Sequence, residues 1–181
     1  MLLYKRLPEP RPIEQYDIVI GRGVEPEVGA LLYGLVRITK PTICVETGLF
    51  VGDSAAWIGR ALADNRKGAL TSCDVSPERV IVARERFKDL PTVTVVQSKG
   101  IDVIRNHERM DFVHVDSGVF DVRLEELLSL TEKNISPGGI VCYHDATRDM
   151  SAAYEHFAGS NNWPHIVFPS YVGFAVFQRP E

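Results

Sequence analysis

Apolar positions along the chain follow two alternating patterns, which together predict an α/β protein. Between residues 26 and 39, Val28, Leu31, Leu32 and Leu35 have the spacing of one helix face. After this stretch, short β-branched or apolar runs alternate with amphipathic segments. The runs predict strands at 42–46, 70–74, 93–97, 111–115 and 140–144, and the segments predict helices at 54–65, 77–88, 100–105 and 122–134.

These alternating units indicate a mostly parallel sheet, because parallel neighbours must be joined by a crossover, usually a helix. The segment 135–139 (ISPGG) predicts a turn into the fifth strand, and a helix around Ala153 and Phe157 follows that strand. Two further strands, at 165–168 and 172–178, are too close together for a crossover helix and predict a hairpin. The expected fold is a Rossmann-like α/β three-layer sandwich, with a seven-stranded, mostly parallel sheet and a C-terminal antiparallel hairpin strand.

The length of 181 residues suits one hydrophobic core, and prolines at 8, 10 and 12 mark an irregular segment before it. We therefore expect an N-terminal arm at 1–25 and one domain at 26–181. No apolar run approaches the roughly 20 residues that span a bilayer, and no signal core is present, so we expect a cytoplasmic protein without a membrane partner. A net charge of −4 argues against general nucleic-acid binding. Cys44, Cys73 and Cys142 fall in predicted strands and are expected to be reduced core residues.

Candidate ligand-binding residues follow the predicted strands, because open parallel sheets bind ligands beyond the carboxyl ends of their strands. Gly48 and Gly52 follow the first strand and let a ligand approach the backbone closely. Ser54 lies where the next helix begins, and the free N–H groups of a helix N-terminus suit a carboxylate or a phosphate. Asp74 ends the second strand, where an acid can bind ribose hydroxyls or can simply cap the helix that begins at Pro77.

Four motifs carry a resemblance to a known family. They are residues 45–55 (VETGLFVGDSA), 73–76 (CDVS), 112–116 (FVHVD) and 137–145 (PGGIVCYHD). They occur in the order seen in class I S-adenosylmethionine-dependent methyltransferases. Over roughly residues 26–179, the chain resembles the small-molecule O-methyltransferase branch, which includes catechol and macrolide-sugar enzymes.

The resemblance implies a cofactor-binding role for ten residues. Near the methionine part it places Glu46, Gly48, Phe50, Gly52, Ser54 and Asp116, and near the adenosine part Asp74, Val75, Gly100 and Ile101. Asp74 would hold the ribose hydroxyls and Val75 would pack on the adenine. Asp116 would face the methionine amine, the methyl group or a bound metal.

The resemblance also implies chemistry at the ends of the fourth and fifth strands. Methyl transfer is an in-line displacement, so much of its catalysis comes from positioning, but a hydroxyl acceptor must also lose its proton. In the resembling branch a divalent cation assists, and here Asp116, His144 and Asp145 occupy the matching catalytic and metal-ligating positions. Asp121 and Asp149 are further oxygen ligands that would favour Mg²⁺. Alternatively, His144 and Asp145 cap the next helix and close a hydrogen-bond network.

The chain departs from the family pattern at one position. The run after the fourth strand usually carries a His or Lys that acts as the base, and here that position is Val119. Either His144 takes the base role, a metal suffices, or methyl transfer is lost. His114, inside the fourth strand, is expected to be a satisfied core histidine. Arg79 and the basic residues after it (Arg84, Arg86 and Lys88) are expected on the solvated side of a helix.

We therefore expect an S-adenosylmethionine-dependent O-methyltransferase that acts on a hydroxylated small molecule. A second possibility is a cofactor-binding regulatory or assembly protein that has lost catalysis, which Val119 favours. A third, an NAD-dependent dehydrogenase, is disfavoured because the first loop lacks Gly-x-Gly-x-x-Gly. The short chain leaves little room for a substrate lid, so a homodimer could complete the acceptor pocket.

Overall fold

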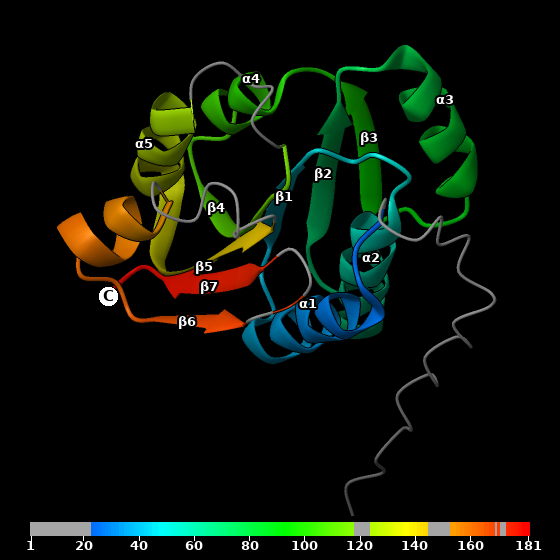
Figure 1. Cartoon of the computed structure of the whole chain (residues 1–181). Coiled ribbons are helices and arrows are strands. Elements are labelled where there is room, and N and C mark those ends of the chain that lie inside the picture. The colour runs from blue at the N-terminus through cyan, green and yellow to red at the C-terminus, as the bar shows by residue number, and fades with distance from the viewer. Residues whose placement is uncertain (1–22, 118–123, 145–152, 169, 171–172) are drawn as a thin grey trace, which may run out of the picture.

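The sheet has seven strands in the order β3-β2-β1-β4-β5-β7-β6 (Figure 1). The computed structural model describes residues 23–117, 124–144, 153–168, 170 and 173–181. The helical elements are α1 (Pro26–Thr39), α2 (Asp53–Asn65), α3 (Pro77–Arg86), α4 (Gly100–Arg105), α5 (Leu124–Asn134) and the π-helical segment η2 (Glu155–Ser160). The strands are β1 (Ile43–Thr47), β2 (Ala69–Asp74), β3 (Val93–Gln97), β4 (Met110–Val115), β5 (Ile135–His144), β6 (His165–Phe168) and β7 (Phe174–Gln178).

Strand directions confirm the predicted fold class. The pairs β1–β2, β2–β3, β1–β4 and β4–β5 are parallel. Strand β7 runs antiparallel to both β5 and β6, as the hairpin prediction requires. Because β2 lies on one side of β1 and β4 on the other, the strand order reverses at β1. Crevices for ligands open at such a reversal, beyond the carboxyl ends of the strands.

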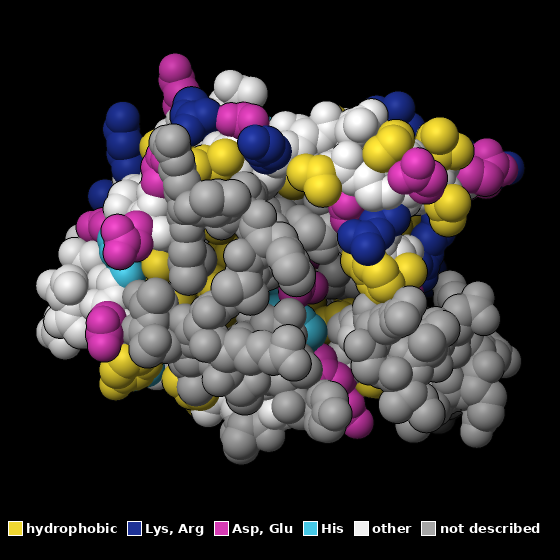
Figure 2. All heavy atoms as spheres, turned by 45° about the horizontal axis from the view of Figure 1, so that its top comes forward, with side chains coloured by type: hydrophobic (Ala, Val, Ile, Leu, Met, Phe, Trp, Pro, Cys, Tyr) yellow, Lys and Arg dark blue, Asp and Glu magenta, His cyan; other side chains and the backbone are white. Residues whose placement is uncertain are grey.

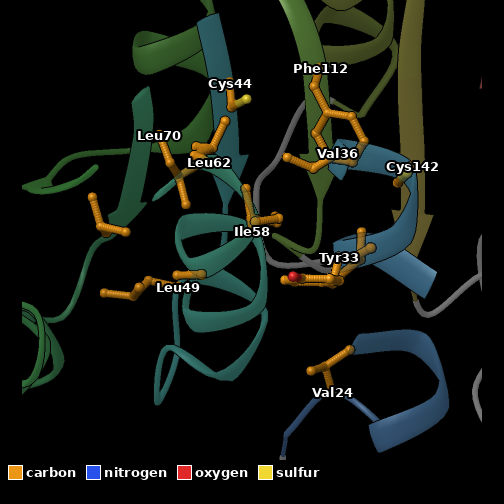
Figure 3. Packing of buried hydrophobic residues seen from close by; sticks show 14 of the residues in the cluster. Val24, Tyr33, Val36, Cys44, Leu49, Ile58, Leu62, Leu70, Phe112 and Cys142 are labelled. Carbon is orange, nitrogen blue, oxygen red and sulfur yellow. The ribbon is translucent and has the colours of Figure 1, made fainter. Parts of the chain in front are cut away.

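The core has two parts, one on each face of the sheet. Successive strand residues point to opposite faces, so Cys44 packs with α1 and α2 while Val45 packs with α4 and α5. Figure 1 shows these helix pairs on opposite sides of the sheet. Figure 3 shows the first face in detail, with side chains of β1, β2, β4 and β5 directed at α1 and α2; these are Cys44, Leu70, Phe112 and Cys142 against Tyr33, Val36, Ile58 and Leu62.

Several local expectations are confirmed. All three cysteines are buried. Helix α1 has the predicted bounds and ends at Lys40 in the left-handed conformation, with φ 49°. The hydroxyl of Ser76 caps α3 by accepting a hydrogen bond from the Arg79 N–H at 3.3 Å, and Pro77 takes the first helical position. Within the described residues, no helix is long and apolar enough to cross a membrane.

One boundary prediction was wrong. Residues 135–139 are the first part of β5 rather than a turn before it. Met110 pairs with Ile135 but Phe112 pairs with Ile140, so β5 carries extra residues against β4 at this point. The extra segment is stabilised by pairing with the end of the chain: the Gly138 N–H donates to the Arg179 carbonyl, and the Arg179 N–H donates to the Gly139 carbonyl, both at 2.9 Å. Such long-range partners have no signature in the local sequence.

Candidate functional site

The loop after β1 turns sharply and lies directly against the end of β4. Gly48 and Gly52 have φ angles of 87° and 82°, a region that favours glycine. A Cβ atom on Gly48 would overlap the backbone of Asp116, so only glycine fits this contact. The N–H groups of Gly48 and Leu49 both donate to the carbonyl of Cys73, at 3.0 and 2.8 Å. The loop is thereby tied to the ends of β2 and β4, the two strands that flank β1.

Phe50 is the strained residue of this loop. Its φ of 48° is left-handed although it is not glycine, and such strain is concentrated at functional sites in proteins. Its N–H donates to Asp74 Oδ2 at 3.0 Å, which helps to hold the conformation. Ser54 follows on α2, buried within the first turn of that helix. The loop therefore presents an aromatic side chain and a helix N-terminus at the carboxyl end of the sheet.

Asp74 is a buried carboxylate at the end of β2. Its Oδ1 accepts from the Ser76 N–H at 2.9 Å, and its Oδ2 accepts from Phe50 and from Arg79 Nη1, the latter at 3.3 Å. Val75 beside it is 62% exposed, which is high for a large apolar side chain. An acid next to an exposed apolar group offers hydrogen bonds to a sugar diol and a surface for a flat base.

The predicted adenine segment is packed under the first loop. Gly100 begins α4, and a Cβ atom there would lie 2.7 Å from the Cβ of Thr47. The Ser117 hydroxyl donates to the hydroxyl of Thr47 at 3.0 Å, and Ile101 is buried. The segments after β1, β3 and β4 are thus brought together at one edge of the sheet.

Glu46 is fully buried rather than exposed at this edge. The hydroxyl of Ser72 donates to its Oε2, and its Oε1 lies 3.1 Å from Nδ1 of His114, which is also fully buried. Within the described part of the chain, Nε2 of His114 has no hydrogen-bond partner, so the expectation of a satisfied core histidine was wrong for that nitrogen. In this structure Glu46 contacts the neighbouring strands β2 and β4 within one face of the sheet, and it supports the site through these contacts.

His144, at the end of β5, lies between two carboxylates. Its Nδ1 is 3.1 Å from Asp116 Oδ1, and its Nε2 is 2.7 Å from Glu25 Oε2. Burial alone would lower the pKa of His144, but the hydrogen bonds and charges of Asp116 and Glu25 outweigh it and raise that pKa to about 9. His144 is therefore an imidazolium at neutral pH, donating to both acids.

The structure brings together most of the predicted site residues and adds two that the sequence reasoning missed. Glu25 precedes α1, and nothing in its local sequence connects it to His144. The Arg79 side chain is 48% exposed, as expected for the solvated side of a helix, but it also contacts Asp74 and Phe50. Figure 2 shows histidine and acidic atoms close together near the middle of this face. The predicted residues Val119, Asp121, Asp145 and Asp149 lie outside the described residues.

The described residues do not by themselves form a metal site. Among those residues, no group of three or more His, Cys, Asp or Glu side chains is placed to hold one. Within the described residues, the nitrogens of His144 face Asp116 and Glu25.

The fold is that of the Rossmann-like methyltransferases. A methyltransferase from Geobacter sulfurreducens superimposes with a TM-score of 0.75 at 20% identity, over 87% of this chain and 80% of that one. The O-methyltransferase TomG from Streptomyces achromogenes, which is involved in tomaymycin synthesis and was solved with S-adenosylmethionine, gives 0.74 at 20% identity, over 88% and 82%. These likenesses establish the architecture.

Sequence comparison adds the family. The profile of the methyltransferase domain matches residues 45–146, more than half of the chain. The chain belongs to this family. A protein of Mycobacterium sp. strain JLS, named as a predicted O-methyltransferase, is 31% identical over 134 residues, which cover 70% of this chain and 59% of that protein. The chain thus spans less than two thirds of the length of such relatives.

Proposed function

We propose that this chain binds S-adenosylmethionine at the carboxyl ends of β1, β2 and β4 and transfers its methyl group to a hydroxyl of a small molecule. One observation carries the proposal: the glycine loop after β1, the buried acid Asp74 and the end of β4 meet where the strand order reverses. Membership of the methyltransferase-domain family supports the same assignment. The name of the mycobacterial relative favours oxygen as the acceptor atom.

The proposed cofactor pose follows the chemistry of these groups. Asp74 receives the ribose hydroxyls, while Val75 and Ile101 border the adenine. Gly48, Phe50, Gly52 and Ser54 surround the methionine part, with its carboxylate toward the N-terminus of α2. Gly100 lets α4 approach the end of β1 closely, and Glu46 supports the loop after β1 from within the sheet. The cationic ammonium and sulfonium groups then lie toward Asp116, whose charge complements theirs.

The proposed proton acceptor belongs to the cluster of Glu25, Asp116 and His144. When bound, the cofactor would supply a methyl group on a positively charged sulfur, and the neutral thioether would be the leaving group when the acceptor oxygen takes the methyl carbon. The acceptor hydroxyl must pass its proton to a base, and Val119 cannot take it. At neutral pH His144 is an imidazolium that orients two carboxylates, so Asp116 is the group we assign to accept the proton. Asp145, the third predicted catalytic residue, stays a proposal.

Calorimetric titration with S-adenosylmethionine tests the cofactor. Wild type should bind, and Asp74→Ala should bind at least tenfold more weakly, about 1.4 kcal/mol. Asp102→Ala is the matched control, because Asp102 pairs with Arg105 on the exposed side of α4 and should leave binding unchanged. Absence of wild-type binding would refute the proposal, and binding of NAD instead would favour a dehydrogenase.

Methyl transfer and metal use are separate questions for the same preparation. Radiolabelled methyl groups should appear on members of a panel of hydroxylated small molecules, and EDTA should leave the rate unchanged if no cation takes part. Loss of activity in EDTA that Mg²⁺ restores would show a metal site that includes residues beyond those described. Binding without turnover on any acceptor would favour the non-catalytic alternative.

Light scattering would test the proposed homodimer.

A further inference from the structure

Arg79 lies over the carboxylate to which we assign the ribose. It belongs to the first turn of α3, and its guanidinium carbon is 4.7 Å from the centroid of the Phe50 ring. Its Nη1 contacts Asp74 Oδ2 at 3.3 Å. The Arg79 side chain is 48% exposed, whereas Asp74 is buried. A half-exposed cation thus covers a buried anion at the carboxyl end of β2.

The hydrogen bonds of Asp74 limit what else it can accept. A carboxylate offers about four acceptor positions. Three are in use, by the N–H groups of Phe50 and Ser76 and by Arg79. A ribose diol brings two further donors, so one of the present donors has to leave.

The donor that leaves is Arg79. The N–H groups of Phe50 and Ser76 belong to the backbone, and moving either would disrupt the strained loop after β1 or the cap of α3. Arg79 is a long, half-exposed side chain that can rotate into solvent. An ion pair with one half-exposed partner is also weakened, because water and salt screen it.

We propose that Arg79 gates the cofactor site by competing with the ribose for Asp74. This inference rests on the proposed function. Each binding event replaces the Arg79–Asp74 ion pair with two hydroxyl hydrogen bonds and removes the guanidinium from the Phe50 ring. Arg79 therefore lowers the affinity for the cofactor, and its removal should raise that affinity by about two- to fivefold, the range expected for a solvent-screened ion pair.

The alternative role for Arg79 predicts the opposite sign. If Arg79 stayed in place and contacted the nucleoside directly, its removal would weaken binding. A purely structural role would change the stability of the protein and leave affinity unaltered.

The test is calorimetric titration of S-adenosylmethionine and S-adenosylhomocysteine into wild type, Arg79→Ala and Arg79→Lys. Arg84→Ala is the matched control, because Arg84 lies on the same helix and contacts the carbonyl of Val95 instead. We expect two- to fivefold tighter binding of both ligands by Arg79→Ala, a smaller gain for Arg79→Lys and no change for Arg84→Ala. The difference between wild type and Arg79→Ala should shrink as salt is added, because salt weakens the competing ion pair.

Equal or weaker binding by Arg79→Ala, with wild type binding normally, would overturn the gate while leaving the proposed function intact. Failure of wild type to bind either ligand would overturn both. Thermal unfolding of each variant shows whether it is folded, and Arg79→Gln provides a second replacement that keeps the length of the side chain. A salt-independent difference would also contradict competition by an ion pair.

Discussion

At the scale of single residues, the site is organised by a buried imidazolium. His144 stays charged because two carboxylates surround it, and each of those acids comes from a different part of the chain. The same arrangement keeps Asp116 oriented at the end of β4, beside the glycine loop. The charge of His144 and the orientation of Glu25 and Asp116 therefore depend on one another, so a substitution at any of the three should affect the other two.

The pKa of His144 predicts a pH-dependent stability. That pKa is about 9 in the folded protein and about 6.5 in an unfolded chain, so folding is favoured by protonation. The contribution of protonated His144 to the free energy of unfolding should be fully present below pH 6.5 and should disappear as the pH rises through 9. Urea unfolding should show that His144→Gln costs on the order of 1–3 kcal/mol at pH 6 and much less at pH 10.

A histidine that contacts a backbone carbonyl provides the control for this experiment. The ring of His165 lies 3.0 Å from the carbonyl of Trp163, and His165→Gln is the matched substitution measured under the same conditions. A cost for His144→Gln that is the same at both pH values would contradict the prediction that His144 is charged between its two carboxylates.

At the scale of elements, the decisive piece is the loop between β1 and α2. It closes over β4, bonds to β2 and leads into α2, so it joins the three elements that form the proposed cofactor site. Its geometry depends on glycines in the left-handed region and on Phe50, which adopts that region without being glycine. A rigid, tightly packed turn of this kind pre-orders the backbone that a ligand meets.

Gly48→Ala should damage the fold and the site together. The new methyl group would overlap the Asp116 backbone, and φ 87° is unfavourable for alanine. We expect a loss of at least about 2 kcal/mol in the free energy of unfolding and at least tenfold weaker cofactor binding. Chemical denaturation and calorimetry measure the two effects.

The matched control is Gly34→Ala in α1, where a Cβ atom would meet nothing within 4 Å. Alanine is the better helix former, so this change should stabilise the protein by about 0.5–1 kcal/mol and leave binding intact. Tolerance of alanine at Gly48 would mean that the loop can move away from β4.

At the scale of the whole molecule, one sheet carries two cores. The first face packs with α1, α2 and α3, and the second packs with α4, α5 and η2. The sheet is the element that both cores share. Loss of the sheet should therefore expose both cores at once, and the protein should unfold in a single cooperative step.

The two tryptophans report on the two faces separately. Trp57 packs against the first core and Trp163 is buried in the second. In Trp163→Phe and Trp57→Phe, the remaining tryptophan should give a fluorescence transition in urea that coincides with the circular dichroism of the same variant. Non-coincident curves would show that one face unfolds before the other.

Local sequence determined much of the fold. The spacing of apolar residues was enough to predict α1, the parallel strands and the C-terminal hairpin, because burial on one or two faces imposes that spacing directly. The turn chemistry of Ser76 and Pro77 likewise predicted the start of α3. The glycines after β1 and the acid after β2 pointed to the edge of the sheet where they were found.

Tertiary structure alone decided which distant residues meet at that edge. The sequence does not show that Glu25 reaches His144, that Arg79 covers Asp74, or that Glu46 turns inward to His114. It also could not place 135–139 in β5, since those residues pair with the end of the chain. Periodicity records which side of an element is buried, whereas the partners of a polar group depend on how whole elements pack. Local patterns therefore predicted the elements and the site edge, and long-range packing set the charges and contacts within the site.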